Sequence, residues 1–160
     1  MNAAVDKVTV LDAMIIGAGI SGMFQLYNLR KMGLNVRAYE TGTDVGGTWY
    51  WNRYPGARFD SQAEIYQYWF DEDMYKSWQP TERFPAQPET EEWLQYVADR
   101  HDLKKDIQFG TRIASAHYDE ESKRWNVTTE CGEKINTKYF IPCCGMLSAP
   151  LENRFRGQRT

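Results

Sequence analysis

The hydrophobic pattern at the start of the chain changes its period twice. Residues 8–16 end in a continuous apolar run, which is typical of a strand buried on both faces. From Ile20 the apolar residues recur every three or four positions as far as the basic turn before Gly33, which indicates an amphipathic helix. Residues 35–40 then alternate as a second strand. This order predicts a βαβ unit with a right-handed crossover, and therefore a parallel sheet.

One long helix is predicted farther along the chain. Residues 89–102 place Trp93, Leu94 and Val97 on one face, behind acidic residues that suit a helix N-terminus. Residues 61–78 mix acidic and aromatic side chains without a clean period, so only short helical turns are expected there.

Several short β-strands are predicted in the second half of the chain. Residues 112–118, 124–129 and 133–138 are separated by turn residues and predict a three-stranded β-meander. Residues 139–144 predict a separate apolar strand that is bent at Pro142, or that lies where one ladder bond is dispensable. The expected fold class is α/β, a Rossmann-like domain with a parallel sheet plus a β-meander.

Composition narrows the class of protein. The 160 residues are 42% hydrophobic and 14% aromatic, which suffices for one core, so a single domain over residues 1–160 is expected. A net charge of −3 without a basic cluster argues against a nucleic-acid partner. Neither a signal-peptide pattern nor an apolar run of about 18 residues is present, so no membrane association is expected.

The cysteines bear on the cellular compartment. Cys131, Cys143 and Cys144 are odd in number, and their spacing matches neither a zinc site nor a disulfide framework, so a reducing, cytoplasmic location is expected. Cys143 and Cys144 are expected to be buried small residues, because a bridge between neighbouring cysteines strains the intervening peptide.

A glycine fingerprint lies between the first strand and the first helix. Gly17 permits a tight turn, Gly19 lets a pyrophosphate approach the backbone, and Gly22 lets the helix pack closely. Ser21 adds a hydroxyl donor at the helix N-terminus. Glu40, at the end of the second strand, is placed to accept hydrogen bonds from an adenosine ribose, which favours FAD or NAD over NADP at this site. The alternative is a plain glycine turn with Glu40 as a solvated strand end.

The most informative stretch follows Glu40 and combines adjacent glycines with aromatic residues and arginines. It reads Gly46-Gly47-Thr48-Trp49-Tyr50-Trp51-Asn52-Arg53-Tyr54-Pro55-Gly56-Ala57-Arg58-Phe59-Asp60. Adjacent glycines let the backbone approach a ligand, tryptophans offer flat apolar surfaces, and arginines bind anions. The pair Gly46-Gly47 resembles the pattern of two-dinucleotide-binding flavoproteins, which favours FAD over NAD. The alternative for Trp49 and Trp51 is ordinary core packing.

Residues 46–60 closely resemble the flavin-dependent Baeyer–Villiger monooxygenases, whose N-terminal regions carry the same aromatic run followed by an acidic residue. The resemblance extends from Ala13 to about Pro150 and includes residues 87–89. It implies that this chain is the N-terminal part of an FAD-binding domain. It also implies a reaction in which NADPH reduces FAD, O2 adds to the flavin, and a C4a-peroxyflavin converts a ketone to an ester or lactone.

The resemblance also assigns residues to the cofactors. Positions that match FAD contacts in the family are Ser21, Glu40, Thr48, Trp49, Tyr50, Trp51, Asp60, Tyr66 and Ile113, and Gly17, Gly19, Gly22 and Gly47 belong to the glycine turns. Arg58, Phe59 and Asp60 match a segment close to the nicotinamide. Asp60, the candidate catalytic residue, corresponds to a carboxylate that pairs with an arginine stabilising the peroxyflavin. Alternatives are a helix cap or an Arg58 partner for Asp60, and core packing for Tyr66.

Parts of the family pattern do not occur in this sequence. A second dinucleotide fingerprint for NADPH, the signature segment with its histidine and tryptophan, and the catalytic arginine are all missing before Thr160. One expectation is that the chain acts only when the remaining part of the monooxygenase completes it, in cis or as another chain. The alternatives are a short, non-catalytic flavin-binding or interaction module, and a simple hydride-transferring NAD or FAD oxidoreductase.

Overall fold

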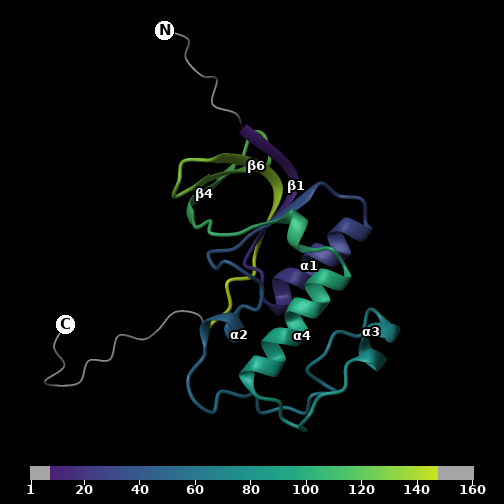
Figure 1. The fold of residues 1–160 in the computed structure, drawn as a ribbon. Coiled ribbons are helices and arrows are strands. Elements are labelled where there is room, and N and C mark those ends of the chain that lie inside the picture. Colours follow the sequence, from purple (N-terminus) through teal and green to yellow (C-terminus); the bar gives the residue numbers. More distant parts are fainter. Residues whose placement is uncertain (1–7, 148–160) are drawn as a thin grey trace, which may run out of the picture.

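A six-stranded mixed sheet organises the computed structural model, which describes residues 8–147 (Figure 1). The strand order is β3-β2-β1-β6-β5-β4. In chain order the elements are β1 (Val8–Ile16), α1 (Ile20–Lys31), β2 (Val36–Tyr39), α2 (Thr48–Trp51), α3 (Glu72–Ser77), α4 (Gln87–Arg100), the 3-10 turn η1 (Lys104–Asp106), β3 (Ile107–Gln108), β4 (Ile113–Asp119), β5 (Arg124–Thr129) and β6 (Lys134–Pro142). The last residues of the family resemblance, up to Pro150, lie outside the described part.

The predicted βαβ unit is confirmed. Strands β1 and β2 are parallel, with Ala13 opposite Val36 and Ile16 opposite Tyr39. Helix α1 connects them and ends before Gly33, which has the positive φ of 79° that favours glycine after a helix. The predicted apolar face of α1 is partly wrong, because Phe24 is 43% exposed.

The prediction of two separate strands over residues 133–144 is wrong. One continuous strand, β6, runs from Lys134 to Pro142. Its first half pairs with β5 in antiparallel fashion, and its whole length pairs with β1 in parallel. Because β6 changes neighbours along its length, its sequence shows no single period. The meander β4-β5-β6 is therefore part of the same sheet as the βαβ unit, and Pro142 is the last residue of the shared strand.

The remaining elements are short or begin earlier than predicted. Helix α4 starts at Gln87, with Pro88 in its first turn, where a missing N–H is tolerated. The two-residue strand β3 was not predicted, and it is held beside β2 by Glu40 N, which donates to the Gln108 carbonyl at 2.9 Å. Within the described residues no helix is long and apolar enough to cross a membrane.

Two hydrophobic clusters lie against the sheet. The larger joins β1, α1 and α4 through residues such as Ile15, Leu26 and Leu94. The smaller joins β1, β5 and β6 around Met14 and Val127. Figure 1 shows that α3 lies away from the β4–β6 end of the molecule. The cavity opens at the carboxyl ends of β1, β2 and β6.

Candidate cofactor site

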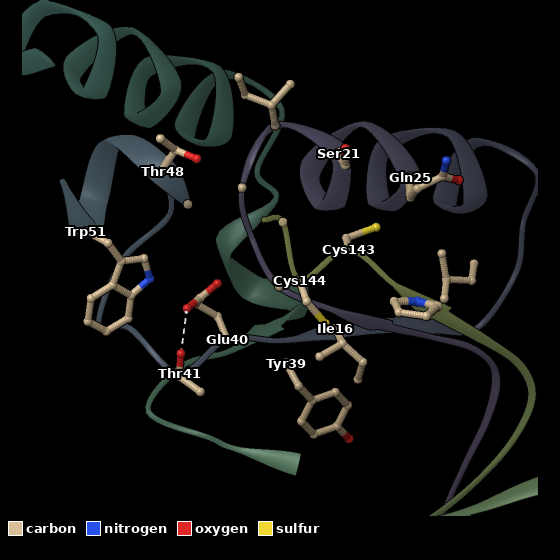
Figure 2. Close-up of a pocket in the computed structure, with 18 of the residues that line it drawn as sticks. Ile16, Ser21, Gln25, Tyr39, Glu40, Thr41, Thr48, Trp51, Cys143 and Cys144 are labelled. Atoms are coloured by element: carbon tan, nitrogen blue, oxygen red, sulfur yellow. Dashed lines mark hydrogen bonds between the residues drawn. The ribbon is translucent and has the colours of Figure 1, made fainter. Parts of the chain in front are cut away.

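A cavity of about 1240 Å³ lies at the carboxyl ends of the parallel strands β1, β2 and β6. Ligands of open α/β sheets bind at this edge. Figure 2 shows Ser21 of α1, Glu40 and Thr41 after β2, Thr48 and Trp51 of α2, and the two cysteines after β6 around the same space. Of the predicted site residues, those that line the cavity are Gly17, Gly19, Ser21, Glu40, Gly47, Thr48, Trp49, Trp51, Tyr66 and Ile113.

The glycine turn leaves the N-terminus of α1 open to the cavity. No side chain caps this helix, and its first backbone bond runs from Met23 N to the Gly19 carbonyl at 2.9 Å. The first N–H groups of a helix lack an intrahelical acceptor and carry a partial positive charge. A Cβ on Gly22 would lie 1.9 Å from the Gly17 carbonyl oxygen, so Gly22 serves close packing inside the turn. The open helix end suits a phosphate group.

Glu40 ties the turn after β1 to the loop after β2. Its side chain accepts hydrogen bonds from Ala18 N at 2.8 Å, from Gly42 N at 2.7 Å and from the Thr41 hydroxyl at 3.2 Å. Glu40 is 5% exposed, so it is not a solvated strand end. A carboxylate has about four acceptor sites, and these three bonds leave capacity for a ligand hydroxyl.

Aromatic side chains of α2 form one wall of the cavity. Trp49 is buried and its Nε1 donates to the Tyr66 hydroxyl at 3.0 Å, while Phe59 stacks on Tyr66 with ring centroids 4.3 Å apart. Trp49 and Tyr66 therefore both line the cavity and belong to the hydrophobic packing. Trp51 also lines the cavity and is 46% exposed. This wall offers flat apolar surface to a planar ligand.

Tyr50, Phe59, Arg58 and Asp60 do not line the cavity, and neither does Gly22. The hydroxyl of Tyr50 instead accepts a hydrogen bond from Thr43 N at 3.1 Å. Phe59 is buried behind Tyr66. Arg58 donates to the Glu82 carboxylate at 2.7 Å, so it is not the partner of Asp60.

Asp60 is an exposed carboxylate near the aromatic wall. Within residues 8–147 its side chain makes no hydrogen bond or ion pair, so it caps no described helix. Burial raises the pKa of Tyr66, and the Asp60 charge raises it further, while the hydrogen bond from Trp49 lowers it.

Several cavity residues were not predicted from the sequence. They include Gln25, Thr41, Thr111, Arg112 and residues 140–146. The strand order could have pointed to these residues, because each of them except Gln25 lies next to the end of an element that the sheet brings to the cavity. The expectation that both cysteines after β6 are buried is wrong for Cys144, which is exposed, whereas Cys143 is half-buried and burial raises the pKa of its thiol.

Known proteins resemble this chain over most of its length. Residues 15–79 match the family model of the NAD(P)-binding Rossmann-like domain. The chain is 57% identical to an acetone monooxygenase (methyl acetate-forming) of a Gordonia species, over 94% of this chain and 28% of that protein. It is 43% identical to a Baeyer–Villiger monooxygenase of Pseudooceanicola batsensis, over 91% of this chain and 27% of that protein. The chain matches the N-terminal portion of flavin-dependent Baeyer–Villiger monooxygenases.

Solved monooxygenase structures share the fold. An oxidized steroid monooxygenase bound to NADP is 42% identical, with a TM-score of 0.89 over 93% of this chain and 29% of that chain. The OTEMO complex with FAD and NADP is 38% identical, with a TM-score of 0.87 over 94% of this chain and 29% of that chain. The predicted Rossmann-like class is confirmed, and the chain spans less than a third of the length of each of these relatives.

Proposed function

We propose that this chain is the FAD-binding part of an NADPH- and O2-dependent monooxygenase that converts ketones to esters or lactones. The observation that carries the proposal is the buried Glu40 carboxylate, which holds the glycine turn at the edge of a cavity walled by Trp49 and Trp51. The open N-terminus of α1 beside them suits a pyrophosphate. The family relationship adds the reaction class.

The residues present fit FAD in three respects. The N–H groups at the start of α1, around Ser21, would bind the pyrophosphate, and Glu40 would accept hydrogen bonds from the ribose. The wall formed by Thr48, Trp49 and Tyr66 would exclude water and orient the rest of the cofactor. Ile113 would add apolar contact from the start of β4. When bound, FAD supplies the electron-transfer and oxygen chemistry.

Asp60 is proposed as a positioning residue for a catalytic arginine. Its carboxylate is exposed and makes no ion pair within the described residues, although Arg58 lies two positions away. A carboxylate holds a guanidinium through paired, charge-assisted hydrogen bonds. The arginine, most of the NADPH site and the ketone pocket are assigned to the remaining part of the enzyme, in cis or as another chain. Tyr50, Arg58 and Phe59 stay predictions as cofactor contacts.

The chain is proposed to act as one FAD-binding domain over residues 1–160 that requires the remaining part for catalysis. This dependence is supported by the relatives, of which the chain covers 28% or less in the two sequence comparisons above. The alternative is a non-catalytic flavin-binding or interaction module. The cytoplasmic location also stays a prediction.

Coupled consumption of NADPH and O2 tests the proposed reaction. The chain would be combined with the remaining part of a relative's enzyme, and NADPH oxidation would be measured with and without a ketone. The proposal predicts ketone-dependent NADPH oxidation with matching O2 uptake and ester formation. A simple hydride-transferring oxidoreductase would oxidise NADPH without productive O2 uptake. Flavin binding without any ketone-dependent turnover would instead favour the non-catalytic module.

A further inference from the structure

The helical turn α2 cannot hold its own conformation. It contains four residues, and isolated helices of this length are unstable because nucleation fixes several dihedral angles for one hydrogen bond. Only the Thr48 carbonyl receives a backbone bond of the helical kind, from Asn52 N at 2.9 Å, and the carbonyls that follow it fall at the helix end, where intrahelical donors are lacking. The cavity wall therefore depends on bonds from outside α2.

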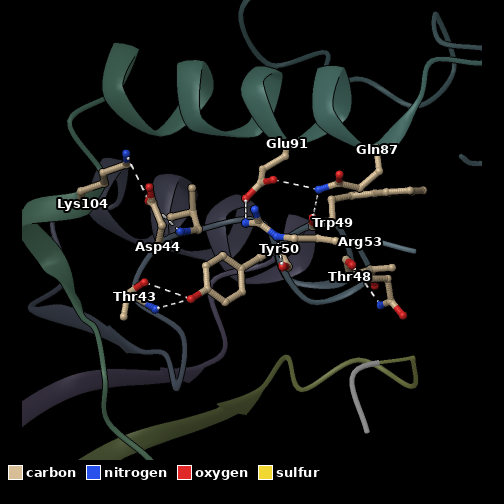
Figure 3. Close-up of polar contacts among 11 residues, drawn as sticks. Thr43, Asp44, Thr48, Trp49, Tyr50, Arg53, Gln87, Glu91 and Lys104 are labelled. Carbon is tan, nitrogen blue, oxygen red and sulfur yellow. Dashed lines mark hydrogen bonds and ion pairs between the residues drawn. The ribbon is translucent and has the colours of Figure 1, made fainter. Parts of the chain in front are cut away.

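Two polar side chains from α4 and one arginine supply these bonds (Figure 3). Gln87 Nε2 donates to the Trp49 carbonyl at 2.5 Å and to Glu91 Oε2 at 2.8 Å. The other carboxylate oxygen of Glu91 accepts from Arg53 Nη2 at 2.5 Å, and Arg53 Nε donates to the Tyr50 carbonyl at 2.9 Å. Two successive carbonyls of the turn are thus bound by one connected network.

Burial makes this network sensitive to the loss of any member. Gln87 is 6% exposed and Glu91 is 8% exposed. A buried carbonyl or carboxylate that loses its partner keeps its full desolvation cost. Glu91 therefore needs Arg53, although the arginine side chain itself is 57% exposed.

We propose that Gln87, Glu91 and Arg53 form a clamp that positions α2 for FAD, an inference that rests on the proposed function. The clamp preorganises Thr48, Trp49 and Trp51 at the cavity wall. It makes no contact with the glycine turn or with Glu40 through the bonds described above. Loss of the clamp therefore weakens the binding of FAD, which meets the α2 wall, more than the binding of ADP, which needs only the glycine turn and Glu40.

The variants are chosen to separate the clamp from general stability. Gln87→Met removes the donor from the Trp49 carbonyl at similar volume, and Glu91→Gln neutralises the partner of Arg53. Arg53→Met breaks the network at its exposed end. This variant replaces Gln87→Met or Glu91→Gln in the test if either of these fails to fold. Glu92→Gln is the matched control, because it is the same chemical change at an exposed position of the same helix.

Two measurements on the 160-residue chain test the clamp. The first is hydrogen exchange of residues 48–51 without cofactor, where Trp49 N and Tyr50 N donate to Gly46 and Gly47 carbonyls at 3.1 Å. Clamp variants are expected to exchange about tenfold faster there, with β1 unchanged and Glu92→Gln like the wild type. Unchanged exchange in the clamp variants overturns the proposal, whether or not FAD binds.

The second measurement compares dissociation constants for FAD and ADP. Clamp variants are expected to bind FAD about tenfold more weakly and ADP as tightly as the wild type does. An equal loss for both ligands, or no loss of FAD affinity, overturns the positioning role. A wild-type chain that binds neither FAD nor ADP would contradict the proposed function. If the clamp variants of such a chain still exchange faster, the clamp holds α2 but its role toward FAD is rejected.

Discussion

Gly19 and Gly47 bring two glycine turns into direct backbone contact at the cavity. A Cβ on Gly47 would lie 2.7 Å from the Gly19 Cα, closer than real side chains approach. One turn follows β1 and the other precedes α2, so this contact joins the open helix N-terminus to the aromatic wall. Both halves of the predicted cofactor site thus depend on two residues having no side chain.

Gly47→Ala is expected to lower both stability and FAD affinity. The residue has a φ of 55°, and the added methyl group would press on Gly19. This backbone conformation, with a ψ of −116°, costs a residue with a side chain about 1–3 kcal/mol, and overpacking adds about 1–3 kcal/mol. The matched control is Gly33→Ala, which has a φ of 79° but open space around its Cβ. Denaturant unfolding of both variants measures the difference, and equal losses would mean that the contact has no energetic role.

Glu40→Gln is expected to destabilise the chain by about 2 kcal/mol, because the buried carboxylate accepts charge-assisted bonds from Ala18 N and Gly42 N. The side-chain amide of the glutamine would point its NH2 group at one of these two backbone N–H groups, and two donors cannot form a hydrogen bond. FAD affinity should fall as well, through the displaced glycine turn. Thermal unfolding and flavin titration measure both effects, with Glu92→Gln as the exposed control. Full stability in Glu40→Gln would show that the carboxylate does not hold the turn.

The βαβ unit could be predicted because its signals are local. Buried parallel strands leave continuous apolar runs, and the turn at Gly17 needs glycine. The continuity of strand β6 could not be predicted, because Tyr139 is 49% exposed in the half that has lost β5 as a neighbour. The role of the clamp residues could not be predicted from the sequence either. Gln87 meets Trp49 from 38 positions away, and only tertiary packing brings such polar groups together.

Acidification is expected to destabilise the fold through His101. Burial lowers the pKa of this histidine below its usual 6.5, while the nearby Asp71 carboxylate acts in the opposite direction and Arg100 and Arg30 lower it further. Because the unfolded chain takes up the proton first, stability is full above about pH 6.5 and falls as the pH drops toward the folded pKa. His101→Gln should flatten the unfolding free energy over this window. The matched variant is His117→Gln, on an exposed position of β4. If the unfolding free energy of His101→Gln depends on pH as that of the wild type does, His101 is not the group responsible.

Asp60→Ala is expected to slow ketone oxygenation in the completed enzyme by roughly 100-fold, because the arginine it positions would lose its orientation. FAD affinity should change little, and stability should stay within about 0.5 kcal/mol, since the side chain is exposed. Asp60→Glu should restore part of the rate. Glu64→Ala, another exposed carboxylate in the same loop, is the control. An unchanged oxygenation rate with weakened flavin binding would reverse the role given to Asp60.

FAD binding by the purified 160-residue chain tests the central claim most directly. Flavin titration, with thermal unfolding at increasing FAD concentration, measures binding and the stabilisation that accompanies it. The account predicts saturable binding and a rise in the unfolding midpoint by several degrees, with both effects reduced in Glu40→Gln. A chain that shows neither a bound flavin spectrum nor any stabilisation by FAD would contradict the account.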